Sequence, residues 1–180
     1  MREQEGKKKI TVAHFNHGTV YAREAEDVVL SYCRRYQIPT IIGRLSVERP
    51  PKTSTEEFWR DERYKFFKGL KGPIVTAHHV GDVIEWWIFT ALHGKPKTIP
   101  YHREDVNVIR PFLTTNKKCF YRWVNKNNVP YVDDPSNDDD SYMRNHIRNN
   151  MIKMAMKVNP GLEKTMIKKV EKEYSCIKEV

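Results

Sequence analysis

Short apolar runs alternate along the chain with amphipathic segments, and this alternation restricts the possible folds more than any other feature. β-Branched runs predict strands at residues 10–15, 38–42, 74–77 and 106–113. Helical spacing predicts helices at residues 24–36, 55–69, 82–92, 116–127 and 142–158, with a charged last helix after a stop at residues 159–161. Strands alternating with helices indicate βαβ units and a parallel sheet. The expected fold is therefore α/β, with an α/β domain at 1–113 and a small helical subdomain at 114–180.

Composition excludes several classes of protein. The chain has 180 residues, of which 39% are hydrophobic, enough for a core, and no apolar run is long enough to span a bilayer. The charged start, Met1 to Lys9, lacks the apolar stretch of a secretory signal. Cys33, Cys119 and Cys176 form no CxxC pair, so we expect neither a zinc site nor disulfides, and a cytoplasmic location. The net charge of +9 favours polyanionic partners such as nucleic acid, or is simply a lysine-rich surface.

A carboxylate pair follows the third predicted strand, in the segment TAHHVGDVIE at 76–85. Ligands of open parallel sheets bind beyond the carboxyl ends of strands, so the position suits a site. Asp82 and Glu85 share one helix face because they are three residues apart. Such carboxylates can hold Mg²⁺ with substrate phosphates or pair with an ammonium group. The alternative is an acidic helix N-terminus, and His78 or His79 can simply be packed or hydrogen-bonded.

Three other segments carry candidate binding residues, each with a structural alternative. Polar residues end the first predicted strand in AHFNH at 13–17, which suits nucleotide contacts or a histidine-rich loop. Arg144 and Arg148 lie one helical turn apart and can bind phosphate or carboxylate, or form a solvated face. Arg60, Arg63 and Tyr64 combine charge with an aromatic ring, as nucleic-acid surfaces do, although core packing explains this helix equally well.

The order of these motifs resembles the N-terminal domain of the tRNA(Ile)-lysidine synthetases, which are PP-loop ATP pyrophosphatases. The resemblance covers roughly residues 10 to 162. The matching features are AHFNH at 13–17, Arg60-x-x-Arg63-Tyr64, TAHH at 76–79 with Asp82 and Glu85, Arg110-Pro111-Phe112-Leu113, NVPYVDDPSN at 128–137, YMRNHIR at 142–148 and Asn159-Pro160.

The resemblance implies a sheet of the adenine-nucleotide alpha hydrolase type and an ATP-dependent ligase that joins lysine to the anticodon cytidine of tRNA(Ile), with Mg²⁺. ATP adenylates the cytidine C2 oxygen, and the lysine amine then displaces AMP. Catalysis is assigned to Asp82, Glu85 and Arg144, with Mg²⁺ on Asp82. Four residues are assigned to cofactor binding: Ala13, His14, His78 and His79. Four arginines are assigned to tRNA or phosphate: Arg60, Arg63, Arg110 and Arg148.

The chain also departs from the family pattern. The phosphate loop SGGxDS has no counterpart between Met1 and Lys9, Gly81 stands where the family usually has Asp, and the C-terminal tRNA-binding domains of longer members are missing. Three explanations fit: a split enzyme completed by an N-terminal polypeptide, a fragment or misplaced start, or an inactive tRNA-binding relative. A related PP-loop activity, such as tRNA thiolation or amide formation, is a further alternative, although many thiolases carry CxxC pairs that are absent here.

Overall fold

The computed structural model describes residues 10–175, so Cys176 and the charged start lie outside the described residues. Contacts divide the chain into two compact units. The first comprises Met1–Gly69 with Pro130–Asp133, and the second comprises Leu70–Val129 with Asp134–Val180. This division falls near Gly69 rather than at residue 113, and the predicted domain boundary stays a prediction.

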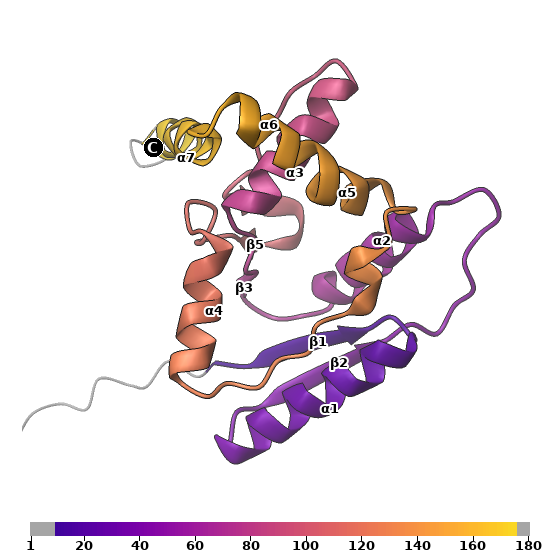
Figure 1. Ribbon diagram of the computed structural model, residues 1–180. Coiled ribbons are helices and arrows are strands. Elements are labelled where there is room, and N and C mark those ends of the chain that lie inside the picture. Colours follow the sequence, from indigo (N-terminus) through magenta and orange to yellow (C-terminus); the bar gives the residue numbers. More distant parts are fainter. Residues whose placement is uncertain (1–9, 176–180) are drawn as a thin grey trace, which may run out of the picture. The chain divides into compact units, whose positions relative to one another are not determined.

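The first unit is built on a parallel strand pair joined by a helix (Figure 1). Strand β1 (Val12–Asn16) pairs with β2 (Thr40–Arg44), with Val12 opposite Thr40. Helix α1 (Val20–Arg35) begins four residues before the predicted start at Glu24. The reason is the Thr19 hydroxyl, which accepts a hydrogen bond from the Ala22 N–H and so caps the helix. The βαβ unit expected from the sequence is therefore present.

Helix α2 (Thr55–Lys68) also belongs to the first unit. Ser54 caps it by accepting a hydrogen bond from the Glu57 N–H. The Phe66 ring lies 5.5 Å from the Phe15 ring, and a Cβ atom at Gly43 would lie 2.6 Å from Phe66. A strand residue without a side chain therefore lets the aromatic face of α2 approach the strand pair closely.

The second unit contains three very short strands. Strand β3 (Ile74–Val75) runs parallel to β5 (Val108–Ile109), and β4 (His102–Arg103) runs antiparallel to β5, with a 3-10 turn, η1 (Glu104–Val106), between β4 and β5. The predicted strand at 106–113 is therefore only partly correct, and β4 was missed. A two-residue strand shows no alternation that sequence periodicity could detect.

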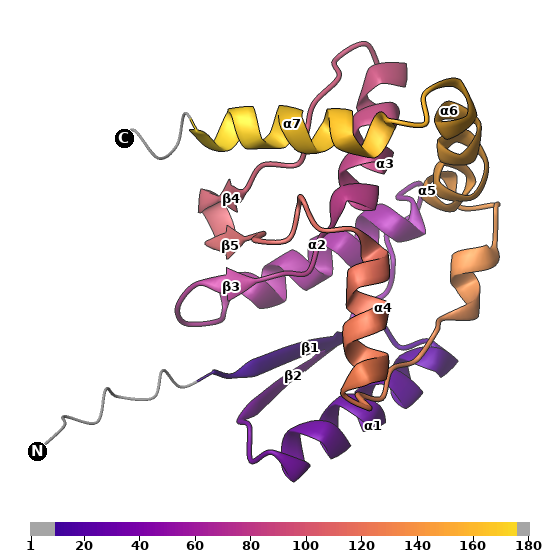
Figure 2. The ribbon, with the colours of Figure 1, turned by 60° about the vertical axis from the view of Figure 1, so that its left-hand side comes forward.

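Helices form most of the second unit (Figure 2). They are α3 (Val80–Leu92), α4 (Lys117–Lys126), the 3-10 turn η2 (Pro135–Asp138), α5 (Met143–His146), the π-helical turn η3 (Ile147–Met151), α6 (Ile152–Val158) and α7 (Leu162–Ser175). The long helix predicted over 142–158 is present, but a π turn interrupts it. One face of α3 forms a hydrophobic core with Leu113 and with the helices after residue 146. The buried side chains of this core are Val80, Val83, Ile84, Ile88, Leu113, Ile147, Ile152, Met166 and Val170.

Parallel pairing between β1 and β2, and between β3 and β5, together with the helices that follow each strand, confirms the predicted α/β fold. Between residues 10 and 175, no helix combines the length and apolar character needed to cross a bilayer.

Candidate functional site

Asp82 and Glu85 lie in the first two turns of α3, just after β3. The start of this helix is fixed from both sides. The Val80 N–H donates to the Thr115 carbonyl at 3.0 Å, and the Val80 and Val83 side chains are buried in the core. The two carboxylates are therefore held on a rigid helix at the end of a strand, as their spacing predicted.

His79 and Asp82 cap α3 reciprocally. The Asp82 carboxylate accepts a hydrogen bond from the His79 N–H at 2.8 Å, and the His79 ring accepts one from the Asp82 N–H at 3.3 Å. Burial lowers the pKa of His79, which the Asp82 charge opposes. A neutral ring is what the second hydrogen bond requires, because Nδ1 must carry a free lone pair to accept. His79 therefore fixes the backbone and the carboxylate of Asp82.

Glu85 is the buried member of the pair, with 6% of its surface exposed. The Arg148 guanidinium donates to its Oε2 through Nε at 3.0 Å and through Nη2 at 2.6 Å, and the same Nη2 lies 3.7 Å from Asp82 Oδ1. Burial raises the pKa of Glu85, and the Arg148 charge opposes this rise. One guanidinium thus bridges both carboxylates and offsets the cost of burying Glu85.

Arg144 lies one turn before Arg148, as predicted, and both face α3. Its Cζ lies 5.9 Å from the centroid of the Trp86 ring. The charge of Arg144 also opposes the rise in the pKa of Glu85, but it is Arg148 that contacts the carboxylates. The π turn at Ile147–Met151 contains Arg148, so the helix widens at the residue that reaches Glu85. Sequence spacing alone gave no sign of this turn.

Three asparagine amides tie the acidic loop to the helix that carries the two arginines. Asn145 donates to the Ser136 carbonyl at 2.6 Å, while Asn149 and Asn150 donate to the Asp140 carboxylate at 2.9 and 2.7 Å. These bonds hold the pKa of Asp140 below its usual range. Sequence reasoning missed this amide clamp, although the repeated Asn near an Asp-rich turn was a usable signal.

The first unit holds the other predicted cofactor residues, Ala13 and His14, on β1. Burial lowers the pKa of His14. His17, beyond the end of the strand, lies between the rings of Phe15 at 5.0 Å and Trp59 at 5.4 Å. Its pKa is lowered to about 4, mainly by burial and further by the charge of Arg63. Burial therefore favours the neutral form of both histidines of the AHFNH motif, and His17 is also packed against aromatic rings.

The remaining predicted residues have identifiable partners. The Arg60 guanidinium lies 5.5 Å from the centroid of the Tyr64 ring. Arg110 is buried, with 3% exposed, and donates to the Pro100 carbonyl at 2.7 Å, which is a structural role. His78 is hydrogen-bonded to the Thr76 hydroxyl at 2.9 Å. The phosphate and cofactor roles of these residues stay predictions, and for Arg110 such a role would require the guanidinium to leave its buried position.

Mg²⁺ would have only a partial set of protein ligands at α3. The described part of the chain contains no group of three or more His, Cys, Asp or Glu side chains that could hold a metal ion. Asp82 and Glu85 nevertheless fit this ion, because Mg²⁺ is often held by one or two carboxylates together with substrate phosphates and water. The Asp82 side chain is 23% exposed and that of Glu85 8%, so Asp82 is the more accessible ligand.

Gly81 leaves room for the His79 cap, which gives a testable coupling. A Cβ atom at position 81 would lie 2.8 Å from His79 Cε1, so the ring would have to turn away and lose its bond to Asp82. In Gly81→Ala we expect this loss, about 1 kcal/mol, to cancel the gain in helix propensity, about 1 kcal/mol at most. In a His79→Ala background the same change should stabilise the chain. Urea unfolding of the wild type, Gly81→Ala, His79→Ala and the double variant measures the coupling. If the two changes in the free energy of unfolding simply add, the steric explanation is wrong.

His17 should make the first unit acid-sensitive. Its folded pKa of about 4 lies below the ordinary value of 6.5. The unfolded chain therefore binds a proton first, so stability is full above pH 6.5 and falls as the pH drops toward 4. We expect a loss of about 2–3 kcal/mol from this group. An NMR titration should place the imidazole midpoint near 4, and His17→Gln should flatten the acid limb of the unfolding profile. A midpoint near 6.5 would show that the ring is not desolvated.

Comparisons with known proteins identify the family of the chain. The sequence profile described as a PP-loop domain matches residues 1–155. The tRNA(Ile)-lysidine synthase of Thermotoga maritima is 32% identical over 168 residues, which cover 86% of this chain and 40% of that protein. The enzyme of the same name from Staphylococcus aureus strain COL is 30% identical over 159 residues, covering 81% and 37%. The chain thus spans about 40% of the length of these relatives.

Among solved structures, the U34-tRNA thiolase NcsA from Methanococcus maripaludis superposes with a TM-score of 0.70. It shares 14% sequence identity and covers 90% of this chain and 60% of its own length, so the likeness concerns the fold alone. The profile match includes the positions of the carboxylate pair on α3. The chain therefore belongs to the PP-loop domain family, in which it is a relative of the tRNA(Ile)-lysidine synthases.

Proposed function

We propose that the chain takes part in tRNA modification as an ATP-dependent ligase that joins lysine to the anticodon cytidine of tRNA(Ile). The observation that carries the proposal is the bridged carboxylate pair, Asp82 and Glu85 with Arg148, on a rigid helix in a PP-loop chain. The similarity to two tRNA(Ile)-lysidine synthases supports the choice of substrates.

The proposed reaction has two displacements. The cytidine C2 oxygen attacks the α-phosphorus of ATP, and pyrophosphate leaves. The lysine amine, after losing a proton, then attacks C2, and the bond from C2 to the adenylate oxygen breaks to release AMP. The first step concentrates negative charge on the leaving pyrophosphate, and the second requires a cationic amine to be bound and deprotonated. A site with two carboxylates and nearby guanidinium groups has the charges for both requirements.

Within this site the residues have different tasks. Asp82, the more exposed carboxylate, would hold Mg²⁺ together with the ATP phosphates, and the ion would neutralise the phosphate charge. Glu85 would keep Arg148 oriented, since its carboxylate accepts two hydrogen bonds from that guanidinium. Arg144, beside Trp86, would be available to phosphate or to the developing charge of pyrophosphate.

Lysine-dependent release of AMP tests the proposal. The purified chain is incubated with ATP, Mg²⁺, lysine and a tRNA(Ile) transcript, and the modified cytidine is identified by mass spectrometry. The assay is run with the chain alone and with an added polypeptide that carries the SGGxDS loop of a relative. AMP release and lysidine in either mixture support the proposal. Their absence from both, while a full-length relative is active under the same conditions, would refute it.

A non-catalytic tRNA-binding role is the second candidate, and the net charge of +9 and the presence of Gly81 favour it. It requires tRNA affinity to fall steeply with salt, because bound phosphates release counterions, and to be unaffected by ATP. Binding that ATP and Mg²⁺ strengthen would favour the ligase instead.

A further inference from the structure

We propose that one face of α4 is a binding surface for single-stranded RNA. The proposal goes beyond the carboxylate site and rests on the proposed function only for the identity of the RNA. Residues 116–128 contain four cationic side chains and no carboxylate. The cations are Lys117, Lys118, Arg122 and Lys126, and all four are exposed. A surface that carries cations and no carboxylate attracts a polyanion.

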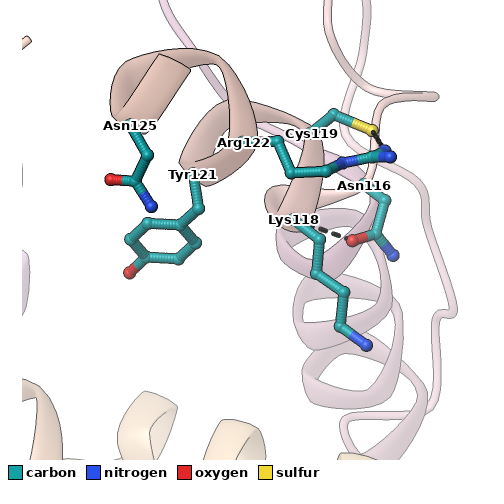
Figure 3. A pocket seen from close by; sticks show the side chains of 6 residues that line it. All are labelled: Asn116, Lys118, Cys119, Tyr121, Arg122 and Asn125. Atoms are coloured by element: carbon teal, nitrogen blue, oxygen red, sulfur yellow. Dashed lines mark hydrogen bonds between the residues drawn. The ribbon is translucent and has the colours of Figure 1, made fainter. Parts of the chain in front are cut away.

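A hollow of about 580 Å³ lies along this helix. It is lined by Asn116, Lys118, Cys119, Tyr121, Arg122 and Asn125 (Figure 3). Within it the Arg122 guanidinium lies against Cys119, with Nη2 3.2 Å from Sγ, while Tyr121 and Asn125 come from successive turns of the helix. The lining thus combines cations, amides and an aromatic ring, all from the segment 116–125.

The packing of α4 explains why this face is presented outward. Phe120 anchors the opposite side, with its ring 5.4 Å from Phe112 and 6.3 Å from His79. The Asn116 amide fixes the N-terminus by donating to the Glu163 carboxylate at 2.7 and 2.8 Å. No residue of α4 is fully buried, and its exposed side includes the four cations and Asn125.

Aromatic side chains next to the cations select the kind of polyanion. The Lys117 ammonium lies 5.2 Å from the centroid of the Tyr121 ring, which lines the hollow. Trp123 lies outside this lining, one turn after Phe120, and is 58% exposed. An exposed indole offers a face on which an unpaired base can stack, and such stacking with a basic groove is how single strands are bound without a fixed sequence. Amides such as Asn125 can bond to base edges that only an unpaired nucleotide exposes. An acidic peptide or a membrane would use the charges but not these groups.

Fluorescence anisotropy of labelled RNA tests the surface on the full 180-residue chain, without ATP or lysine. The probes are a short single-stranded RNA of mixed sequence and a blunt duplex of the same sequence. We expect tighter binding of the single strand. Lys118→Gln/Arg122→Gln should raise its Kd about tenfold and reduce the slope of log K against log salt by about 1.4, since each lost phosphate contact removes about 0.7.

Lys168→Gln/Lys169→Gln on α7 is the matched control, because it removes the same charge from exposed positions of the same unit. It should leave the Kd within about twofold, because non-specific charge alone acts weakly at a distance under salt. An equal effect of both pairs, no RNA binding, or a preference for the duplex would each overturn the proposal.

Trp123 supplies an independent readout. Trp123→Ala should weaken binding of the single strand about 5- to 100-fold through lost stacking, whereas Trp123→Phe should keep most of the affinity. Equal losses in the two variants would overturn the stacking role. The two proposals can fail separately. Absent AMP release would refute the proposed function, but intact RNA binding would still support the α4 surface. Normal RNA binding by the α4 variants would overturn the surface even if the chain is an active ligase.

Discussion

Arg148→Met is expected to lower the free energy of unfolding by about 2–3 kcal/mol at neutral pH. Removing one partner of a fully buried ion pair typically costs about 3–5 kcal/mol, because the remaining charge is left without compensation. The effect here is smaller because the Arg148 side chain is 41% exposed, so water can reach part of the vacated space. Glu85 carries the penalty, since its side chain is only 8% exposed and both hydrogen bonds come from Arg148.

The penalty should depend on pH in a defined direction. Burial already raises the pKa of Glu85 above its ordinary value of 4.5, so between pH 4.5 and the folded pKa the folded chain binds more protons at this group than the unfolded chain does. The stability from this group is full below pH 4.5 and falls as the pH rises through the folded pKa. Without Arg148 the pKa rises further. The difference between wild type and Arg148→Met should therefore shrink as the pH is lowered toward 4.5.

Urea unfolding measures this difference, with two matched proteins. Arg144→Met removes the same charge one turn away, from a side chain that stacks near Trp86, and should cost less than about 1 kcal/mol. Arg148→Met/Glu85→Gln should recover part of the loss, because a neutral amide is cheaper to bury than a carboxylate. Equal effects of the Arg144 and Arg148 changes at every pH would show that Glu85 does not depend on Arg148.

The sequence predicted the elements that have strong periodicity and missed those that depend on single contacts. Alternating strands and helices were sufficient for the α/β fold. The start of α1 was missed because a single contact, the hydrogen bond from the Ala22 N–H to the Thr19 hydroxyl, fixes it, and apolar spacing does not reveal such a contact. Strand β4 was missed because two residues carry no period, and its antiparallel pairing with β5 across the short turn η1 leaves no apolar alternation in the sequence. Local pattern therefore predicts the interior of an element better than its boundary.

The candidate site shows the same division. The spacing of Asp82 and Glu85 placed them on one helix face, and the structure confirms that they lie together, bridged by Arg148. The partner could not be chosen from spacing, because Arg144 and Arg148 differ by one turn and a π turn intervenes. Arg110 illustrates the opposite difficulty: the resemblance assigns it to tRNA or phosphate, and no sequence pattern indicated that its guanidinium is buried and donates to the Pro100 carbonyl.

Asp82→Asn is expected to lower the rate of lysine-dependent AMP release by about 10²–10³-fold while leaving stability nearly unchanged. An amide oxygen can still accept the hydrogen bond from the His79 N–H, so the cap of α3 is preserved. The substitution removes the negative charge that would hold Mg²⁺ against the phosphates. Loss of one electrostatic contact to a transition state typically lowers the rate by about 10²–10³-fold. The variant should also need more Mg²⁺ for half-maximal rate, because an uncharged ligand binds this ion weakly.

Glu24→Gln on the exposed surface of α1 is the control, because it removes one carboxylate from an exposed position of the other unit. Its rate and Mg²⁺ dependence should match those of the unmodified chain. Glu85→Gln separates the two carboxylates: it should lower the rate through the loss of Arg148 orientation, without a comparable change in the Mg²⁺ requirement. If Asp82→Asn and Glu85→Gln shift the Mg²⁺ dependence equally, both carboxylates hold the ion, and Arg148 must leave Glu85 when the phosphates bind.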